Sequence, residues 1–217
     1  MWNWSENQVE LIFLRHGATT ENEQHRYLGR TDTSLSKNGI CELQELWENE
    51  NAPNPELLFC SPMKRCMETV ELLYPNHMPI SIPEWSEMDF GEFEGKNYME
   101  LQENPDYQAW IDSNGTLPFP GGESREAFVK RCEQGFYRML TAIREMLLKT
   151  DEQKQHRKLV AGAVVHGGTI MAVLSSFCGG EYFDYQVKNG WGYRCLLGGT
   201  WEQPELYRLE KIPIENA

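Results

Sequence analysis

The chain has 217 residues, 40% hydrophobic and 24% charged, which is typical of a globular protein with a sizeable core. Its formal net charge of −13 argues against nucleic acid or an anionic membrane as a standing partner. No stretch approaches the ~20 apolar residues that span a bilayer, and the first ten residues lack the basic and apolar regions of a signal peptide. We therefore expect a cytoplasmic protein whose six cysteines are reduced thiols.

The first predicted element is a short buried strand over residues 11–14 that runs directly into Arg15-His16-Gly17. In open α/β sheets, ligands bind just beyond the carboxyl ends of strands, where Arg15 and His16 are expected to lie. An imidazole beside a guanidinium offers a nucleophile or base next to a cation that binds phosphate or carboxylate. On this tripeptide alone, a surface His and Arg that merely end a strand are an equally good interpretation.

Strands and helices alternate along the rest of the chain, which indicates an α/β fold with a mainly parallel sheet. Ser61 and Pro62 are expected to be the N-cap and the first residue of the second helix. Further strands are predicted at 57–60, 80–82, 159–165, 193–197 and 206–209, and helices at 36–47, 62–73, 124–149 and 169–177.

Residues 84–123 are irregular, rich in aromatic side chains, and hold ten acids against one base, Lys96. We expect a small cap with helices near 97–103 and 105–112, inserted into a single domain that covers residues 1–217. One hypothesis is that this acidic cap repels a second phosphate and stacks its rings on the substrate. The alternative is that its acids face solvent and its rings form its own core.

Charged or nucleophilic side chains follow three of the predicted strands. Arg15 and His16 end the first strand, Arg65 lies early in the helix after the second, and His166 ends the strand at 159–165. The carboxyl ends of parallel strands share one edge, so these residues can converge. Because no carboxylate lies at short ligand spacing from either histidine, they indicate an oxyanion pocket, without a metal or other cofactor.

Six motifs in the same order carry a more specific signal. They are Arg15-His16-Gly17 with Thr19 and Asn22; Arg26-Tyr27-x-Gly29-Arg30-x-Asp32 with Leu35-Ser36 and Gly39; Ser61-Pro62-x-x-Arg65-x-x-x-Thr69; Glu87-x-x-Phe90-Gly91-x-Phe93-Glu94-Gly95; Pro120-Gly121-Gly122-Glu123-Ser124; and His166-Gly167-Gly168. Together they resemble the motifs of the histidine phosphatase superfamily, in its phosphoglycerate-mutase-like branch. One departure is Ala18, which stands where a Glu is common.

The resemblance implies a three-layer αβα fold and a two-step phosphomonoester hydrolysis. His16 is then the nucleophile that becomes phosphohistidine, and Glu87 the acid that protonates the leaving alcohol. Glu84 is a rival acid, although its position within the motif favours Glu87. The resemblance further assigns phosphoryl-oxygen contacts to Arg15, Arg65 and His166, and substrate contacts to Asn22, Thr19, Gly29, Arg30 and Gly167.

Among these phosphatases, the YLGRTD loop and the PGGES turn are most similar to those of α-ribazole phosphatases of cobamide synthesis. The expected partner is therefore a small phosphorylated metabolite such as α-ribazole 5′-phosphate. Mutases of the superfamily carry an Arg-His-Tyr-bearing insertion where Gly95-Lys96-Asn97-Tyr98 follow here, which disfavours a phosphoglycerate mutase. A broad-specificity or fructose-bisphosphate phosphatase and a regulatory binding protein are further alternatives, and either a monomer or a homodimer is compatible with the sequence.

Cys132 and Arg138 have the Cys-x-x-Gly-x-x-Arg spacing of cysteine-dependent phosphatases. That chemistry requires a phosphate-binding loop between a strand and a helix. Cys132 instead lies in the apolar stripe of a long predicted helix, between Phe128 and Phe136. We therefore expect Cys132 to be a core residue.

Overall fold

The computed structural model describes residues 2–6, 8–48, 52–150 and 158–213, and within them lies a six-stranded sheet of order β3-β2-β4-β1-β5-β6. The first four strands of that order run parallel; β5 pairs antiparallel with β1, and β6 with β5. The strands are β1 (Gln8–Arg15), β2 (Leu57–Cys60), β3 (Ile80–Ser81), β4 (Lys158–Val165), β5 (Gly192–Gly199) and β6 (Pro204–Ile212).

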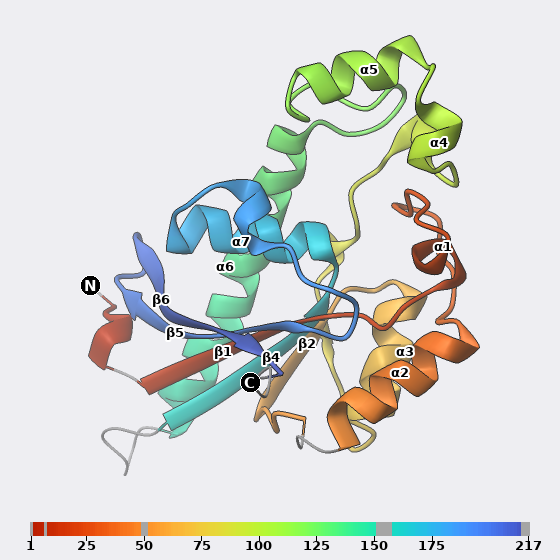
Figure 1. Ribbon diagram of the computed structural model, residues 1–217. Coiled ribbons are helices and arrows are strands. Elements are labelled where there is room, and N and C mark those ends of the chain that lie inside the picture. Colours follow the sequence, from red (N-terminus) through yellow and green to blue (C-terminus); the bar gives the residue numbers. More distant parts are fainter. Residues whose placement is uncertain (1, 7, 49–51, 151–157, 214–217) are drawn as a thin grey trace.

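Helices cover both faces of this sheet (Figure 1). On one face lie α6 (Arg125–Thr150) and α7 (Gly167–Cys178), and on the other lie α2 (Lys37–Glu48) and α3 (Lys64–Leu73). The three layers confirm the expected αβα architecture. No helix of the described residues is both long and apolar enough to cross a membrane.

The burial of β1 on both faces explains its nearly continuous apolar sequence. Leu11 and Phe13 join the core beneath α6 and α7, whereas Ile12 and Leu14 join the core beneath α2 and α3. All four side chains are at most 1% exposed. Strands of parallel sheets that are covered on both faces have this composition, so β1 could be located from its sequence.

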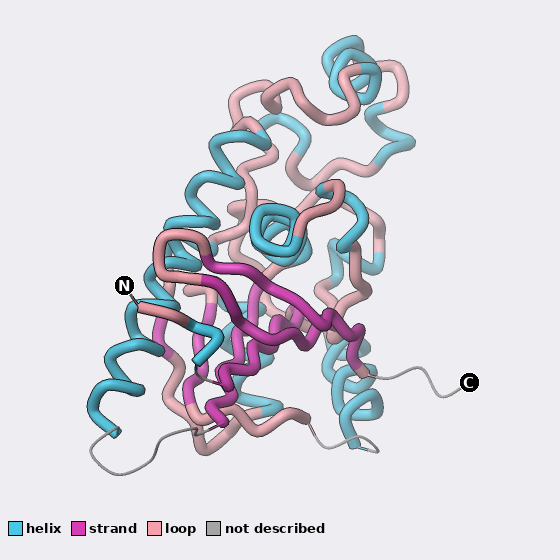
Figure 2. Tube along the Cα trace, turned by 90° about the vertical axis from the view of Figure 1, so that its left-hand side faces the viewer, coloured by secondary structure: helices cyan, strands magenta, loops and turns pink. Residues whose placement is uncertain are grey.

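Two short helices, α4 (Tyr98–Leu101) and α5 (Pro105–Asp112), stand off from the sheet beyond the carboxyl ends of its parallel strands (Figure 2). Asn97 caps α4 by accepting a hydrogen bond from the backbone N–H of Glu100, and Asn104 caps α5 in the same way. Both helices lie where the sequence predicts them. The remaining short elements are α1 (Thr20–Glu23) and 3₁₀ turns at Trp4–Glu6, Pro83–Trp85, Gly91–Phe93 and Tyr182–Tyr185.

Two predicted helix starts were wrong. Helix α3 begins at Lys64 rather than Pro62, and α7 begins at Gly167 rather than Thr169. The Ser61 hydroxyl is 2.8 Å from Nε2 of His166, so Ser61 connects two strand ends before the helix begins. Residue His166 occupies the N-cap position of α7, which brings its imidazole to the end of β4.

The register of the parallel strands places the site residues at one edge. Arg15 at the end of β1 pairs with Val165 of β4, and Cys60 of β2 pairs with Val164. The residues that follow each strand, among them His16 and His166, therefore meet although 150 residues separate them in sequence.

Candidate active site

The ring of His16 is fixed by a hydrogen bond at one of its two nitrogens. Its Nδ1 lies 2.7 Å from the carbonyl oxygen of Gly17, which can only accept, so Nδ1 carries the hydrogen. Nε2 consequently keeps its lone pair. Burial, with the charges of Arg65 and Arg15, holds the pKa of His16 well below its ordinary value. The imidazole is thus neutral at physiological pH and has a nucleophilic Nε2.

The second histidine, His166, packs against the first with ring centroids 5.1 Å apart. Its Nε2 lies 2.8 Å from Ser61 Oγ, and its Nδ1 lies 4.0 Å from Oε2 of Glu87. Burial and the charge of Arg65 are the main causes that hold the pKa of His166 well below its ordinary value. Two neutral imidazoles therefore face each other at this edge of the sheet.

Two arginines supply the positive charge. Arg65 is 0% exposed and donates from Nη1 and Nη2 to the carbonyl oxygens of Thr31 and Gly29, at 3.0 and 2.9 Å. Arg15 donates from Nη1 to the carbonyl oxygen of Val187, at 2.8 Å. The Nε atoms of both arginines are buried without a hydrogen-bond partner among the described residues. Fixed guanidinium groups with unused donors suit a phosphoryl group or another oxyanion.

Glu87 brings a carboxyl group to the same place. It is 8% exposed, and Oε1 accepts a hydrogen bond from the backbone N–H of Met88 at 2.9 Å. Burial raises the pKa of Glu87, although Met88, Arg65 and Arg15 oppose the shift. The position depends on Gly168, because a Cβ there would lie 2.5 Å from Oε1. Glu87 is therefore a carboxyl group that stays protonated to higher pH than an exposed one.

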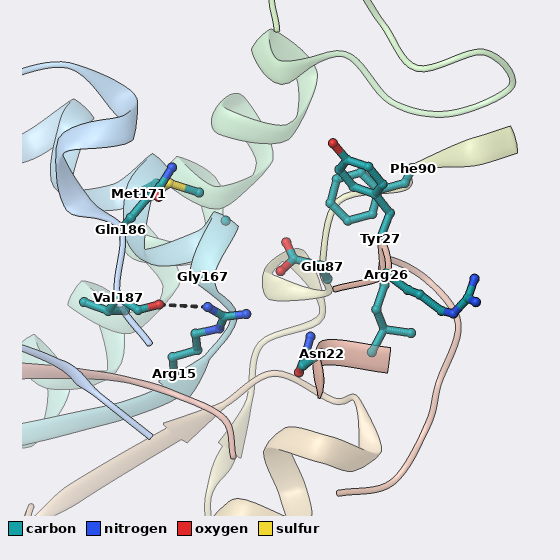
Figure 3. Close-up of a pocket in the computed structure, with 12 residues that line it drawn as sticks. Arg15, Asn22, Arg26, Tyr27, Glu87, Phe90, Gly167, Met171, Gln186 and Val187 are labelled. Atoms are coloured by element: carbon teal, nitrogen blue, oxygen red, sulfur yellow. Dashed lines mark hydrogen bonds between the residues drawn. The ribbon is translucent and has the colours of Figure 1, made fainter. Parts of the chain in front are cut away.

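Of these groups, Arg15 and Glu87 border a cavity of about 240 Å³ (Figure 3). Arg15, Asn22, Glu87 and Gly167 line it, and Figure 3 shows the Glu87 carboxyl group and the Arg15 guanidinium facing the same space. The Oδ1 atom of Asn22 already accepts from the backbone N–H of Thr19 and from Asn189, which leaves its amide N–H groups for the cavity. The more deeply buried neighbours of this lining are His16, Arg65 and His166, which are 2%, 0% and 0% exposed.

Three of the predicted substrate-binding residues lie outside this lining. Thr19 is buried as the N-cap of α1, and Gly29 has no room for a side chain because a Cβ would lie 2.1 Å from the carbonyl oxygen of Met88. Arg30 is exposed, and its backbone N–H bonds Glu94. Thr19 and Gly29 hold Asn22 and Arg65 through backbone and capping contacts, so their placement favours a supporting role over contact with a ligand.

The rival acid Glu84 is paired with Arg138, at 3.3 Å, and lines neither this cavity nor the aromatic one described below. Of the ten acids of residues 84–123, only Glu87 lines these cavities, and it lines both. Several others serve the fold: Glu94 bonds the loop at Thr31, Glu100 pairs with Arg26, and Glu123 pairs with Arg131. The acids of residues 84–123 other than Glu87 therefore do not line either cavity, and the repulsion of a second phosphate by their charge stays a prediction.

Cys132 is 0% exposed within α6, and burial raises the pKa of its thiol. The nearby Trp85 indole donates to the carbonyl oxygen of Cys132, at 3.1 Å. This confirms a core cysteine inside a helix, without the phosphate-binding loop that a cysteine nucleophile requires. All six cysteines are free thiols, as expected.

Residues that no motif singled out hold the site together. Asn189 donates from Nδ2 to Oδ1 of Asn22 and to the carbonyl oxygen of His16, both at 3.1 Å. Arg131 donates to the carbonyl oxygens of Glu84, Ser86 and Glu87, and so fixes the segment that carries the acid. The sequence offered no signal for either residue.

Residues 11–190 match the model of the histidine phosphatase superfamily (branch 1). The chain belongs to this superfamily. An adenosylcobalamin/α-ribazole phosphatase of Escherichia coli (strain K12) is 32% identical over 136 residues, which cover 60% of the chain and 66% of that relative. The crystal structure of the α-ribazole phosphatase from Shigella flexneri has a TM-score of 0.71 and 24% identity, over 95% of the chain and 100% of that structure.

A phosphoglycerate mutase from Thermus thermophilus has a TM-score of 0.62 at 26% identity, over 95% of the chain and 99% of that structure. The fold of this histidine phosphatase is thus the phosphoglycerate-mutase-like fold that its motifs imply. The family match and the phosphatase names of its relatives confirm the expected class, a phosphatase of the histidine phosphatase superfamily.

Proposed function

We propose that the protein hydrolyses phosphomonoesters through a covalent phosphohistidine on His16. The observation that carries this proposal is the neutral, Nδ1-protonated His16, which feels the charges of Arg65 and Arg15 in a site that also holds a carboxyl group of raised pKa. A regulatory binding protein on the same fold would need the cations but neither the free Nε2 nor the protonated acid. The hydrolase is therefore preferred to the binding protein.

In the first step, Nε2 of His16 forms a bond to phosphorus as the bond to the ester oxygen breaks. Glu87 transfers its proton to the departing oxygen, so the alcohol leaves neutral and Glu87 becomes a carboxylate. Arg15, Arg65 and His166 stabilise the negative charge spread over the three equatorial oxygens. The reaction needs no group beyond these side chains.

In the second step, water attacks the phosphohistidine, and the Glu87 carboxylate accepts the proton that the water loses. Inorganic phosphate and neutral His16 result, and Glu87 is protonated again for the next cycle. The water must approach phosphorus from the side that the alcohol has left, which is the side of Glu87. One carboxyl group therefore serves as acid in the first step and as base in the second.

The substrate we propose is α-ribazole 5′-phosphate or a similar small monophosphate. Support comes from the Escherichia coli relative, which is named for α-ribazole. A second argument is the short connection after the acid motif. Helix α4 begins at Tyr98, three residues after Gly95, so the insertion that mutases carry at this point is missing, which disfavours a phosphoglycerate as substrate.

The proposed nucleophile predicts a trapped intermediate. Wild-type protein quenched during turnover of a ³²P-labelled ester should carry acid-labile, base-stable label on His16, and His16→Ala should carry none and lose turnover. Chelators should leave the rate unchanged, because the phosphoryl charge is met by arginines. Base-labile label, or label on Cys132, would contradict the assignment.

The proposed acid predicts a dependence on the leaving group. Glu87→Gln should slow alkyl esters about 10²–10⁴-fold and activated aryl esters far less. Gly168→Ala, which displaces the carboxyl group, should show a milder form of the same bias. Only the protonated acid works, so kcat/KM for an alkyl ester should fall as pH rises through the raised pKa of Glu87, and this limb should vanish in Glu87→Gln. Equal losses on both ester classes would indicate a structural role.

The proposed substrate predicts an order of kcat/KM. α-Ribazole 5′-phosphate should exceed 3-phosphoglycerate and fructose 2,6-bisphosphate under identical conditions. Conversion between 2- and 3-phosphoglycerate, followed in the same preparations, should be undetectable. A preference for the bisphosphate, or measurable mutase activity, would contradict the substrate proposal but not the proposed phosphohistidine chemistry.

A further inference from the structure

Beside the phosphoryl site lies a second cavity of about 190 Å³ with a different chemistry. Half of its lining residues are aromatic, and Met171 adds another apolar side chain. The aromatic residues are Tyr27, Phe90, Trp110, Phe119, Tyr182 and Phe183. An apolar cavity with few polar groups is the usual form of a small-molecule pocket.

The two cavities adjoin at Glu87, which lines both, as do Tyr27, Phe90, Gly168 and Met171. The Glu87 carboxyl group therefore stands between the cation site and the aromatic cavity. In the proposed reaction, this carboxyl group delivers a proton to the leaving oxygen. Whatever is attached to that oxygen must extend from Glu87, and the aromatic cavity begins there.

The walls are rings from three parts of the chain: Tyr27, residues 90–119 and residues 182–183. Phe119 has ring centroids 5.0 Å from both Phe90 and Trp110, and Tyr182 lies 5.1 Å from Phe183. Gly115 lies beside Trp110 and Phe183, since a Cβ there would be 3.1 Å from the first and 3.7 Å from the second. Because Gly115 has no side chain, it leaves the cavity volume beside these two rings open. An engineered apolar cavity of about 150 Å³ holds benzene, so this one is large enough for a ring.

The charge at the rim selects among possible ring ligands. Arg125 lies over the rings of Tyr182 and Phe183, at 5.5 and 5.7 Å from their centroids. Aromatic cages also bind quaternary ammonium groups, but the Arg125 guanidinium and a protonated Glu87 disfavour a second cation here. An uncharged planar ring is compatible with both.

We propose that this aromatic cavity is the leaving-group site, and that it selects monophosphates whose alcohol carries an uncharged planar ring a short linker away from the ester oxygen. The proposal rests on the proposed function, because it is that reaction which places the leaving oxygen at Glu87. Phe183 is the best residue at which to test this selection of ring-bearing substrates. It is 40% exposed at the mouth of the cavity, so its replacement leaves the core intact.

The test compares 2-phenylethyl phosphate with ethyl phosphate, two alkyl esters that differ in the ring alone. Wild-type kcat/KM should favour the ring ester at least about tenfold, and Phe183→Ala should lower this ratio about three- to tenfold. Tyr98→Ala is the matched control, because Tyr98 is 59% exposed on α4 and lines neither cavity, so the ratio should not change. An equal preference for both esters in wild type, or an unchanged ratio in Phe183→Ala, overturns the proposal.

Binding to His16→Ala protein, measured by calorimetry, separates this proposal from the proposed function. The ring ester should bind more tightly than ethyl phosphate there, and the added Phe183→Ala change should reduce the difference. If neither ester is turned over by wild type, the hydrolase proposal fails while the binding preference still decides the role of the cavity. Tighter binding of phosphocholine than of the ring ester would identify a cage for cations and overturn the proposal.

Discussion

The site depends on two guanidinium groups at the carboxyl edge of the sheet, that of Arg65 fully buried and that of Arg15 partly buried. Arg65 is held by the loop carbonyl oxygens of Gly29 and Thr31, and Arg15 is held by the carbonyl oxygen of Val187. Backbone carbonyls compensate these charges only in part, because a carbonyl is a dipole and not an anion. The remaining positive potential acts on the neighbouring groups, among them His16 and His166.

This potential explains why the neighbouring groups are neutral. It lowers the pKa of His16 and His166 in addition to the effect of burial, so neither imidazole adds a third charge. At Glu87 burial acts against the arginines and prevails, so the carboxyl pKa is raised. An incoming dianionic phosphoryl group then supplies the negative charge that balances the two arginines. The uncompensated cations cost folding stability, which is a common trade in binding sites.

The sequence was sufficient to predict the architecture and the position of the site for a simple physical reason. Parallel strands buried on both faces are recognisable as apolar runs, and the residues that follow them must share an edge. The placement of His16, Arg65 and His166 follows from that alone. Interactions between distant segments were beyond such reasoning: no local pattern shows that Ser61 reaches His166, or that Asn189 joins Asn22 to the backbone of His16.

The same limit explains the errors. Acidic side chains in an irregular segment have no periodicity to tell which face they occupy, and four of the ten in residues 84–123 pair with arginines or a loop N–H group. Arg30 and Thr19 also lie within site motifs, and their contacts in the structure are with the chain itself: Thr19 caps α1, and the backbone N–H of Arg30 bonds Glu94. For the aromatic residues the sequence left two alternatives, and the structure supports both, since the rings pack together and also line a cavity.

The central claim is that His16 is a neutral imidazole whose hydrogen is on Nδ1 and whose Nε2 is free. Nitrogen-15 chemical shifts of the two ring nitrogens, followed from pH 8 downward in ¹⁵N-histidine-labelled protein and assigned with His16→Ala, measure this directly. The account predicts an Nδ1–H tautomer that does not titrate near the ordinary histidine pKa of about 6.5, and a pKa that rises when Arg65 is replaced by Met. A hydrogen on Nε2, or protonation of His16 at an ordinary pKa, would contradict it.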